Sequence, residues 1–255
     1  MAAAQRALEL DPSLAPGHAA LGTIAFFLEW DWERAEVAYR RSIELDPGFV
    51  SGRAAYSVAL AHQGRIDEAL AQVRRVIEIE PLAQSFGDVD LGQLLFWKGD
   101  WKAALEAWHD TLEFSPSHYT SLLNLGGYYC ESGQTDEGFE LLRRARSLYP
   151  QTPQVLAEIG ACHAVAGDPD AAREVLDELE AWTLREYVDP VNLAVVHLAL
   201  GEDDQVFAWL ERGYERRAFL MTEIGSDPRY ERLYGDPRFR DLTERIGLRE
   251  RAPHD

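Results

Sequence analysis

Histidine and cysteine side chains are the first candidates for metal or acid–base chemistry in this sequence. The histidines are spread along the chain, as His18, His62, His109, His118, His163, His197 and His254. None of them forms the His-x-x-x-His or His-Glu-x-x-His spacing that places two ligands on one helical face. Cys162 and His163 are adjacent, so on a helix their side chains diverge by about 100° and make poor co-ligands. The sequence therefore predicts no metal site and no cofactor, and the histidines are interpreted as packing residues.

Nucleophilic and phosphate-binding motifs are absent from the sequence as well. There is no Gly-x-Ser-x-Gly, no phosphate-cradling glycine loop and no Cys-x-x-Cys. Acidic residues number 44, too many to single out a catalytic pair, and most are expected on solvated helix faces. Trp30 and Trp32 could form a stacking platform, although tryptophans beside a turn more often anchor its packing. We predict a protein that is not an enzyme, with catalysis on a helical-repeat frame as the minor alternative.

Charge and hydropathy limit the partners. The formal charge of −19 would repel nucleic acid and an anionic membrane surface. No apolar run reaches the roughly 18 residues of a membrane span. We expect a protein or peptide partner of apolar or basic character, no direct nucleic acid binding and no membrane insertion, while self-association stays open. Two cysteines do not make a disulfide framework, so a cytoplasmic location is predicted, with a periplasmic or extracellular one left open.

Four sets of residues recur every 34 or 35 positions. Prolines that follow apolar stretches stand at Pro12, Pro47, Pro81, Pro116 and Pro150. Small residues stand at Gly22, Ser57, Gly92, Gly126, Gly160 and Ala194. Turn glycines stand at Gly64, Gly99, Gly133, Gly167 and Gly201. A second small-residue set consists of Ala35, Ala69, Ala104, Gly138, Ala172 and Val206. A shared period of this length predicts a repeat architecture.

Each recurring residue type has a physical role in a pair of helices. The small residues let two helices approach closely, and the turn glycine ends the first helix where a left-handed residue is needed. Aspartates in the same turns can cap the second helix. The closing proline then stops that helix, because proline cannot continue it. Each unit is thus predicted to be two antiparallel helices.

The order of these residues resembles the tetratricopeptide repeat. The residues that carry the resemblance in one unit are Leu122, Leu125, Gly126, Tyr129, Gly133, Gly138, Leu142, Ala145 and Pro150. The resemblance implies an all-α fold, a right-handed superhelical solenoid of antiparallel helix pairs with a C-terminal helical cap. We predict that residues 1–14 are the second helix of a truncated repeat, that residues 15–217 form six hairpins and that residues 218–255 form short capping helices and a tail.

Two departures from the repeat carry further expectations. Residues 29–34, Glu-Trp-Asp-Trp-Glu-Arg, replace the inter-helix glycine of the first full unit and add one residue. The half-unit at the start predicts either a fragment of a longer protein or a chain that begins later than its relatives. The ending, with Asp-Pro at residues 227–228 and 236–237, resembles the tails of tetratricopeptide domains in bacterial signalling proteins. That likeness gives an alternative function, a sensor or regulatory module of a DNA-binding regulator, cyclase or kinase.

The resemblance also implies where a partner would bind, because first helices line the concave face of such an array. Almost no cation stands at the inward positions, which argues against a clamp for a C-terminal carboxylate. An apolar, aromatic groove remains, and it suits an apolar peptide or helix. Trp97 is expected to be an exposed anchor. We predict a non-catalytic protein–protein interaction scaffold with peptide-binding residues Thr23, Phe26, Phe27, Val58, His62, Phe86, Gln93, Phe96, Trp97, Leu123 and Glu131.

Overall fold

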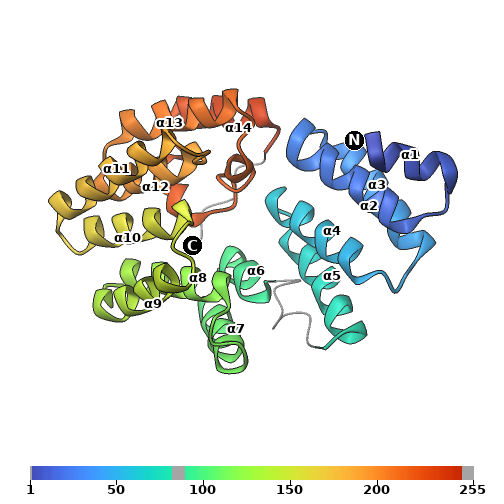
Figure 1. Ribbon diagram of the computed structural model, residues 1–255, viewed down its shortest axis with the longest axis horizontal. Helices are drawn as coiled ribbons and strands as arrows, with labels where there is room; N and C mark the ends of the chain where they lie inside the picture. Colours follow the sequence, from blue (N-terminus) through green and yellow to red (C-terminus); the bar gives the residue numbers. More distant parts are fainter. Residues whose placement is uncertain (1, 82–89, 249–255) are drawn as a thin grey trace. The chain divides into compact units, whose positions relative to one another are not determined.

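A computed structural model describes residues 2–81 and 90–248, and every regular element in these two ranges is a helix (Figure 1). The predicted all-α fold is therefore confirmed. The chain divides into two compact units, which are described separately. Unit 1 comprises Met1–Trp101, Thr222–Pro228 and Thr243–Asp255, and unit 2 comprises Lys102–Met221 and Arg229–Leu242.

Unit 1 is built from helix pairs joined by short turns. Its helices are α1 (Ala2–Leu10), α2 (Ala15–Ile24), the π-helical turn η1 (Ala25–Glu29), α3 (Trp32–Leu45), α4 (Val50–His62), α5 (Ile66–Ile79) and α6 (Leu91–Lys98). Helix α2 packs against α3, α4 packs against α5, and α2 also contacts α4, the first helix of the next pair. The core between them contains the fully buried side chains of Tyr39, Leu60, Leu70 and Val73. Helix α1 buries none of its residues.

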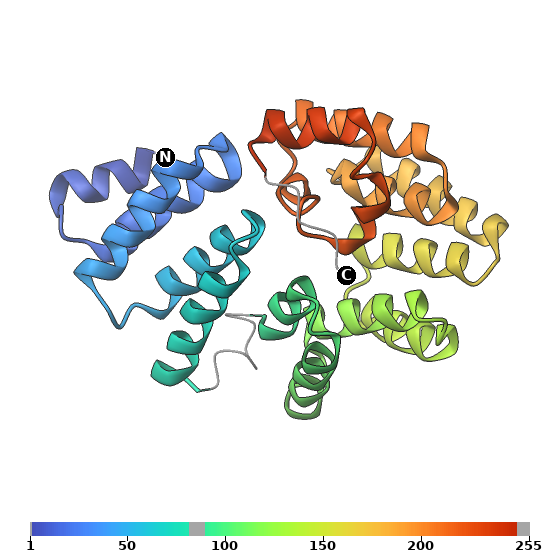
Figure 2. The same cartoon turned by 180° about the vertical axis from the view of Figure 1, so that it is seen from behind.

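Unit 2 continues the same arrangement, seen from both sides in Figures 1 and 2. Its elements are α7 (Trp101–Phe114), α8 (Tyr119–Glu131), α9 (Thr135–Leu148), α10 (Pro153–Val165), α11 (Pro169–Thr183), α12 (Pro190–Leu200), α13 (Asp203–Glu215), η3 (Phe219–Thr222), η4 (Pro228–Leu233) and α14 (Pro237–Ile246). Helices α8, α10 and α12 pack against α9, α11 and α13 respectively, and α10 contacts both α8 and α12. The last three elements belong to the tail, which contributes segments to each unit in turn.

The recurring small residues sit where helices approach most closely. A methyl group added at Gly22 would lie 2.8 Å from Cδ1 of Tyr39, and one at Gly126 would lie 2.8 Å from Cγ of Leu142. Ala35, Ala69 and their counterparts in the second helices are fully buried. The predicted close packing of each pair is confirmed, and larger side chains at these positions would separate the helices.

Within the described residues, five of the turns that join paired helices contain a glycine in the left-handed backbone conformation. Gly64, Gly99, Gly133, Gly167 and Gly201 all have positive φ angles, between 74° and 88°, as the sequence predicts.

The first pair has no such glycine and carries one extra residue. The extra residue is taken up by the π-helical turn η1, in which each turn holds more residues than an α-helix does. Trp30 then adopts the left-handed conformation with φ 55° and takes the place of the glycine.

Two first helices of unit 2 are joined by a disulfide between Cys130 on α8 and Cys162 on α10. Both side chains are buried, and their Cα atoms are 5.2 Å apart. The cysteine count alone gave no reason to pair them. Their separation of 32 residues, close to one repeat, is the sequence signal that places them on neighbouring first helices.

Candidate peptide-binding surface

Four of the predicted peptide-binding residues meet in unit 1, on the first helices of successive pairs. The ring centroids of Phe26 and Phe27 are 4.7 Å apart, and His62 lies 5.6 Å from Phe26 and 5.3 Å from Trp97. Trp32, at the start of α3, packs edge-on to Phe26 with centroids 4.7 Å apart. These five side chains, Phe26, Phe27, Trp32, His62 and Trp97, are called the aromatic face below.

Most of the aromatic face is buried. Phe26 is fully buried, His62 is 3% exposed and Trp97 is 5% exposed. The expectation that Trp97 is an exposed anchor is therefore wrong, because Trp97 belongs to the core of unit 1. Trp32 is partly buried against the same core, as expected for a tryptophan that anchors a turn.

Part of the chain's own tail covers the aromatic face at the end of α4. Oγ1 of Thr222 lies 2.9 Å from Nδ1 of His62, and the Ser226 hydroxyl donates to the carbonyl of Ala61 at 3.0 Å. Thr222 and Ser226 are both buried. A carboxylate oxygen of Glu223 is 3.9 Å from Nε2 of His62. The segment Thr222–Pro228 thus uses two hydroxyl groups, four residues apart, to bind two neighbouring residues of α4.

A second part of the tail reaches the aromatic face at Trp32. Its indole Nε1 donates to the carbonyl of Ile246 at 2.9 Å. A methyl group added at Gly247, which has φ 79°, would lie 2.7 Å from that nitrogen, so the approach depends on glycine. One stretch of the tail therefore lies on His62, which the sequence predicts for a partner peptide, and another lies on Trp32, which the sequence predicts as a turn anchor.

Burial sets the electrostatics of this surface. Desolvation lowers the pKa of His62 to about 3, because the buried imidazolium would lose its hydration. His62 is thus a neutral ring at physiological pH and bonds to Thr222 as a neutral group. The contact of His62 with the tail is thus one between a neutral ring and a hydroxyl.

The remaining predicted residues are not part of the aromatic face as defined above, although Phe96 packs against the same core. Thr23 is exposed and accepts a hydrogen bond from the Tyr39 hydroxyl at 3.1 Å. Val58, Gln93 and Phe96 are half-buried, with Phe96 packed edge-on to Trp101. In unit 2, Leu123 is buried in the core and Glu131 is exposed on α8. Phe86 lies outside the described residues.

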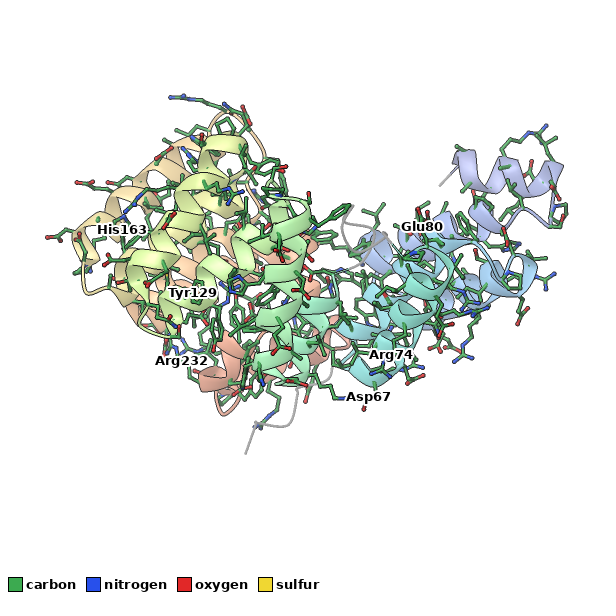
Figure 3. The ribbon with its side chains drawn as sticks, turned by 90° about the horizontal axis from the view of Figure 1, so that it is seen from below. Asp67, Arg74, Glu80, Tyr129, His163 and Arg232 are labelled. Carbon is green, nitrogen blue, oxygen red and sulfur yellow. A yellow bond between two sulfur atoms is a disulfide. The ribbon has the colours of Figure 1, made fainter. Side chains whose placement is uncertain are left out.

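The tail also binds unit 2, and there it uses arginine. Nη1 of Arg229 lies 2.8 Å from a carboxylate oxygen of the buried Glu158 on α10, and its Nε lies 3.9 Å from Glu131. Arg232, labelled in Figure 3, lies 2.6 Å from Asp203 and donates to the carbonyl of Leu198. Sequence reasoning missed Glu158 and these arginines. A basic residue soon after each Asp-Pro pair of the tail was the available signal.

Other candidates for chemistry are packed as structural residues. His163 packs on the ring of Phe139 at 4.6 Å, and Nδ1 of His197 lies 2.7 Å from Glu202. Among residues 2–81 and 90–248, no three His, Cys, Asp or Glu side chains are grouped so that they could hold a metal ion. None of the helices in those ranges has the length and apolar composition needed to cross a membrane.

Comparisons with known proteins agree with the repeat architecture. Two family models, both described as tetratricopeptide repeat, match residues 31–83 and 89–153 in one case and 129–188 in the other. Together they cover more than half of the 255 residues. The chain belongs to the tetratricopeptide repeat family.

Among relatives, the "Protein CTR9 homolog" of Arabidopsis thaliana is 33% identical over 114 residues, 44% of this chain. That stretch is only 10% of the plant protein.

Solved structures extend the likeness of fold. A crystal structure of PilW, described as a widely conserved type IV pilus biogenesis factor, aligns with a TM-score of 0.60 and 18% identity. The alignment covers 76% of this chain and 88% of PilW. The hetero-tetramer Cut9–Hcn1 of the APC/C gives a TM-score of 0.65 and 15% identity, over 95% of this chain and 44% of that one. At these identities the likeness shows the fold alone.

Proposed function

We propose that this protein is a non-catalytic interaction scaffold and that the aromatic face of unit 1 is where it holds a partner polypeptide. Tetratricopeptide repeat proteins generally mediate protein–protein interactions. The observation that carries the proposal is that two stretches of polypeptide already lie on this face, bonded to His62 and Trp32. Buried aromatic side chains commonly supply the anchoring energy of such contacts. The partner is a protein segment of apolar or basic character, because the chain carries a net charge of −19.

Photo-crosslinking tests this proposal in cells that express the protein. A photoreactive residue is placed at the half-buried Phe27 of the aromatic face or at the half-buried Gln93, which shares α6 with Trp97, and at the exposed Val37 on α3 as a matched control. We expect the same partner to crosslink from the first two positions and not from Val37. Equal crosslinking from all three positions, or from Val37 alone, would place the binding surface elsewhere.

A regulatory module of a bacterial signalling protein is the second candidate function. The tail favours it, since a chain that covers its own binding face carries a means of controlling access to that face. An in-frame DNA-binding, kinase or cyclase domain upstream in the gene would support this candidate, and a gene that begins with these repeats would remove it.

The cellular compartment of the protein also decides which partners it can meet. A cytoplasmic location is the prediction from the low cysteine count, whereas a disulfide such as Cys130–Cys162 persists mainly in oxidising compartments. Thiol labelling of the protein in its own cells separates the two. Labelled cysteines would support the cytoplasm, and unlabelled cysteines that react only after reduction would support an oxidising compartment.

A further inference from the structure

We propose that the tail segment Thr222–Pro228 is an exchangeable occupant of the aromatic face, and that the partner segment shares its chemistry. The partner would present two hydroxyl side chains four residues apart, one to His62 and one to the carbonyl of Ala61. This inference rests on the proposed function and specifies both the kind of partner and the step that admits it. The partner must first displace Thr222 and Ser226 from α4.

The hydrogen bonds define what the face recognises. His62 is buried and its Nδ1 is bonded to the Thr222 hydroxyl, so a partner that replaces Thr222 would present a hydroxyl at the same place. The carbonyl of Ala61 already accepts from the backbone N–H of Gly64, and the Ser226 hydroxyl is its second donor. Because Ala61 and His62 are consecutive at the end of α4, one short segment must supply both hydroxyl groups.

The segment is internally hydrogen-bonded, and its Thr222, Ile224 and Ser226 side chains are buried. The N–H groups of Ser226 and Asp227 both donate to the carbonyl of Glu223, so the segment forms its own turn. Helices α2 to α5 share a core that includes Tyr39, Leu60 and Val73, and no residue of the segment belongs to that core.

The residues on either side of the segment are held independently of the aromatic face. The N–H of Leu220 donates to a carboxylate oxygen of Asp189 at 3.1 Å, within unit 2. On the other side Arg229 pairs with Glu158, again within unit 2. Release of the segment from α4 would therefore leave both of its ends anchored. A seven-residue loop with fixed ends gains limited conformational entropy on release, so the entropy cost of its rebinding is small.

A peptide competition tests the proposal on the full chain. The probe is a fluorescent synthetic peptide with the sequence of residues 218–229, and its binding is measured by anisotropy. The double variant Thr222→Val, Ser226→Ala removes the two hydroxyl groups from the tail and leaves the face intact. Since each such bond contributes a factor of about five to ten, we expect the variant to bind the peptide at least about tenfold more tightly than the parent chain.

Matched controls separate exchange from general destabilisation. Thr111→Val deletes a buried hydroxyl of unit 2 that donates to the carbonyl of Ala107 in the same helix, and this variant should bind the peptide as the parent does. A peptide that carries the same two substitutions should lose binding to the double variant by about tenfold. Equal affinity of the parent and the double variant, or no binding by either, would overturn the proposal.

Two further measurements keep the proposal testable if the double variant does not fold. Hydrogen exchange of the parent chain should show the amides of Ser226 and Asp227 exchanging at least about a hundredfold faster than those in the middle of α4. Equal protection would mean a fixed cap. Light scattering tests whether the tail of a second copy occupies the face instead. A dimer that dissociates when the peptide is added would show this and would also overturn the proposal. Neither result bears on the crosslinking test, so failure of exchange and failure of the scaffold function remain distinguishable.

Discussion

The two units bind the tail by different chemistry. In unit 1, the contacts are hydroxyl groups and a backbone carbonyl against a neutral histidine, a helix-end carbonyl and a tryptophan. In unit 2, the contacts are guanidinium groups against carboxylates, as for Arg229 with Glu158. The first set is buried and apolar in its surroundings, whereas the second is partly solvated.

This difference bears on the proposal that the tail is exchangeable in unit 1 and permanently bound in unit 2. Unit 2 has a disulfide across α8 and α10 as well as the arginine pairs, so several independent links hold it together. In unit 1, hydrogen bonds of Thr222, Ser226 and Trp32 link the tail to α3 and α4. The predictions below test whether the two units respond separately.

The largest expected effect is that of Trp97→Ala in unit 1. Loss of a buried tryptophan leaves a cavity and should lower the free energy of unfolding of unit 1 by about 3–5 kcal/mol. Hydrogen exchange followed segment by segment measures the change, with unit 2 as the internal reference. Val37→Ala, at an exposed position on α3, should change stability by less than about 0.5 kcal/mol. A variant that keeps the stability of unit 1 and only loses partner binding would restore the sequence-based view of Trp97 as an exposed anchor.

Reduction of the disulfide should act on unit 2. Opening a cross-link between residues 32 apart returns conformational entropy to the unfolded chain, worth about 3–4 kcal/mol in the chain-entropy model. Denaturant unfolding with and without a reductant measures the difference, and a chain with both cysteines changed to alanine should no longer respond to the reductant. If reduction weakened α2–α5 as much as α8–α11, the view of two separately stabilised units would be wrong.

The repeat itself could be predicted almost completely, because each of its turns and helix contacts requires a particular type of residue. A left-handed turn needs glycine and a close helix contact needs a small residue, so Gly133 and Gly126 report their own positions. The extra residue at Trp30 was also visible, although its accommodation as a π-helical turn was not. The resemblance to the tetratricopeptide repeat implied which positions of the first helices face inward, and it therefore grouped Phe26, His62 and Trp97.

What covers those residues could not be predicted from the same signals. The partners of His62 and Trp32 are Thr222 and Ile246, which are 160 and 214 residues further along the chain. They lie in a tail without repeat periodicity, so no register relates them to α4. The exposure of Trp97 was mispredicted for another reason, since its register position does not show that the ring packs into the core of unit 1 beside His62. The cysteine pair shows the opposite case, because both members lie on first helices of neighbouring repeats, although not at the same register position.

Acid should weaken unit 1 through His62. His62 has a pKa near 6.5 in an unfolded chain and about 3 in the fold. Below pH 6.5 its imidazole is therefore protonated in the unfolded chain but stays neutral in the folded chain. Stability is therefore unaffected above pH 7 and falls as the pH drops, by about 2 kcal/mol between pH 7 and pH 5. Among charged groups, the carboxylate of Glu223 faces the imidazole, at 3.9 Å, and by favouring the protonated ring it can only reduce the loss.

Urea unfolding of unit 1 at pH 7, 6 and 5 measures this effect, and His62→Gln should remove the His62 share of the pH dependence. A parent chain and a His62→Gln chain with the same pH profile would contradict the buried, neutral state of the ring.

The smallest of the four effects separates the two tail contacts by salt. Arg229→Ala should cost unit 2 about 1–2 kcal/mol, since Glu158 is left buried while the pair itself is partly solvated. Raising the salt concentration screens such a pair and should speed hydrogen exchange in η4, whereas the neutral bonds of Thr222 and Ser226 should not respond. Comparing the parent with Arg229→Ala at low and high salt isolates the charge, because the variant should have lost its salt dependence there. If hydrogen exchange in the segment 222–228 responded to salt as strongly as exchange in η4, charge pairs would hold both parts of the tail. The distinction between an exchangeable part and a fixed part would then be wrong.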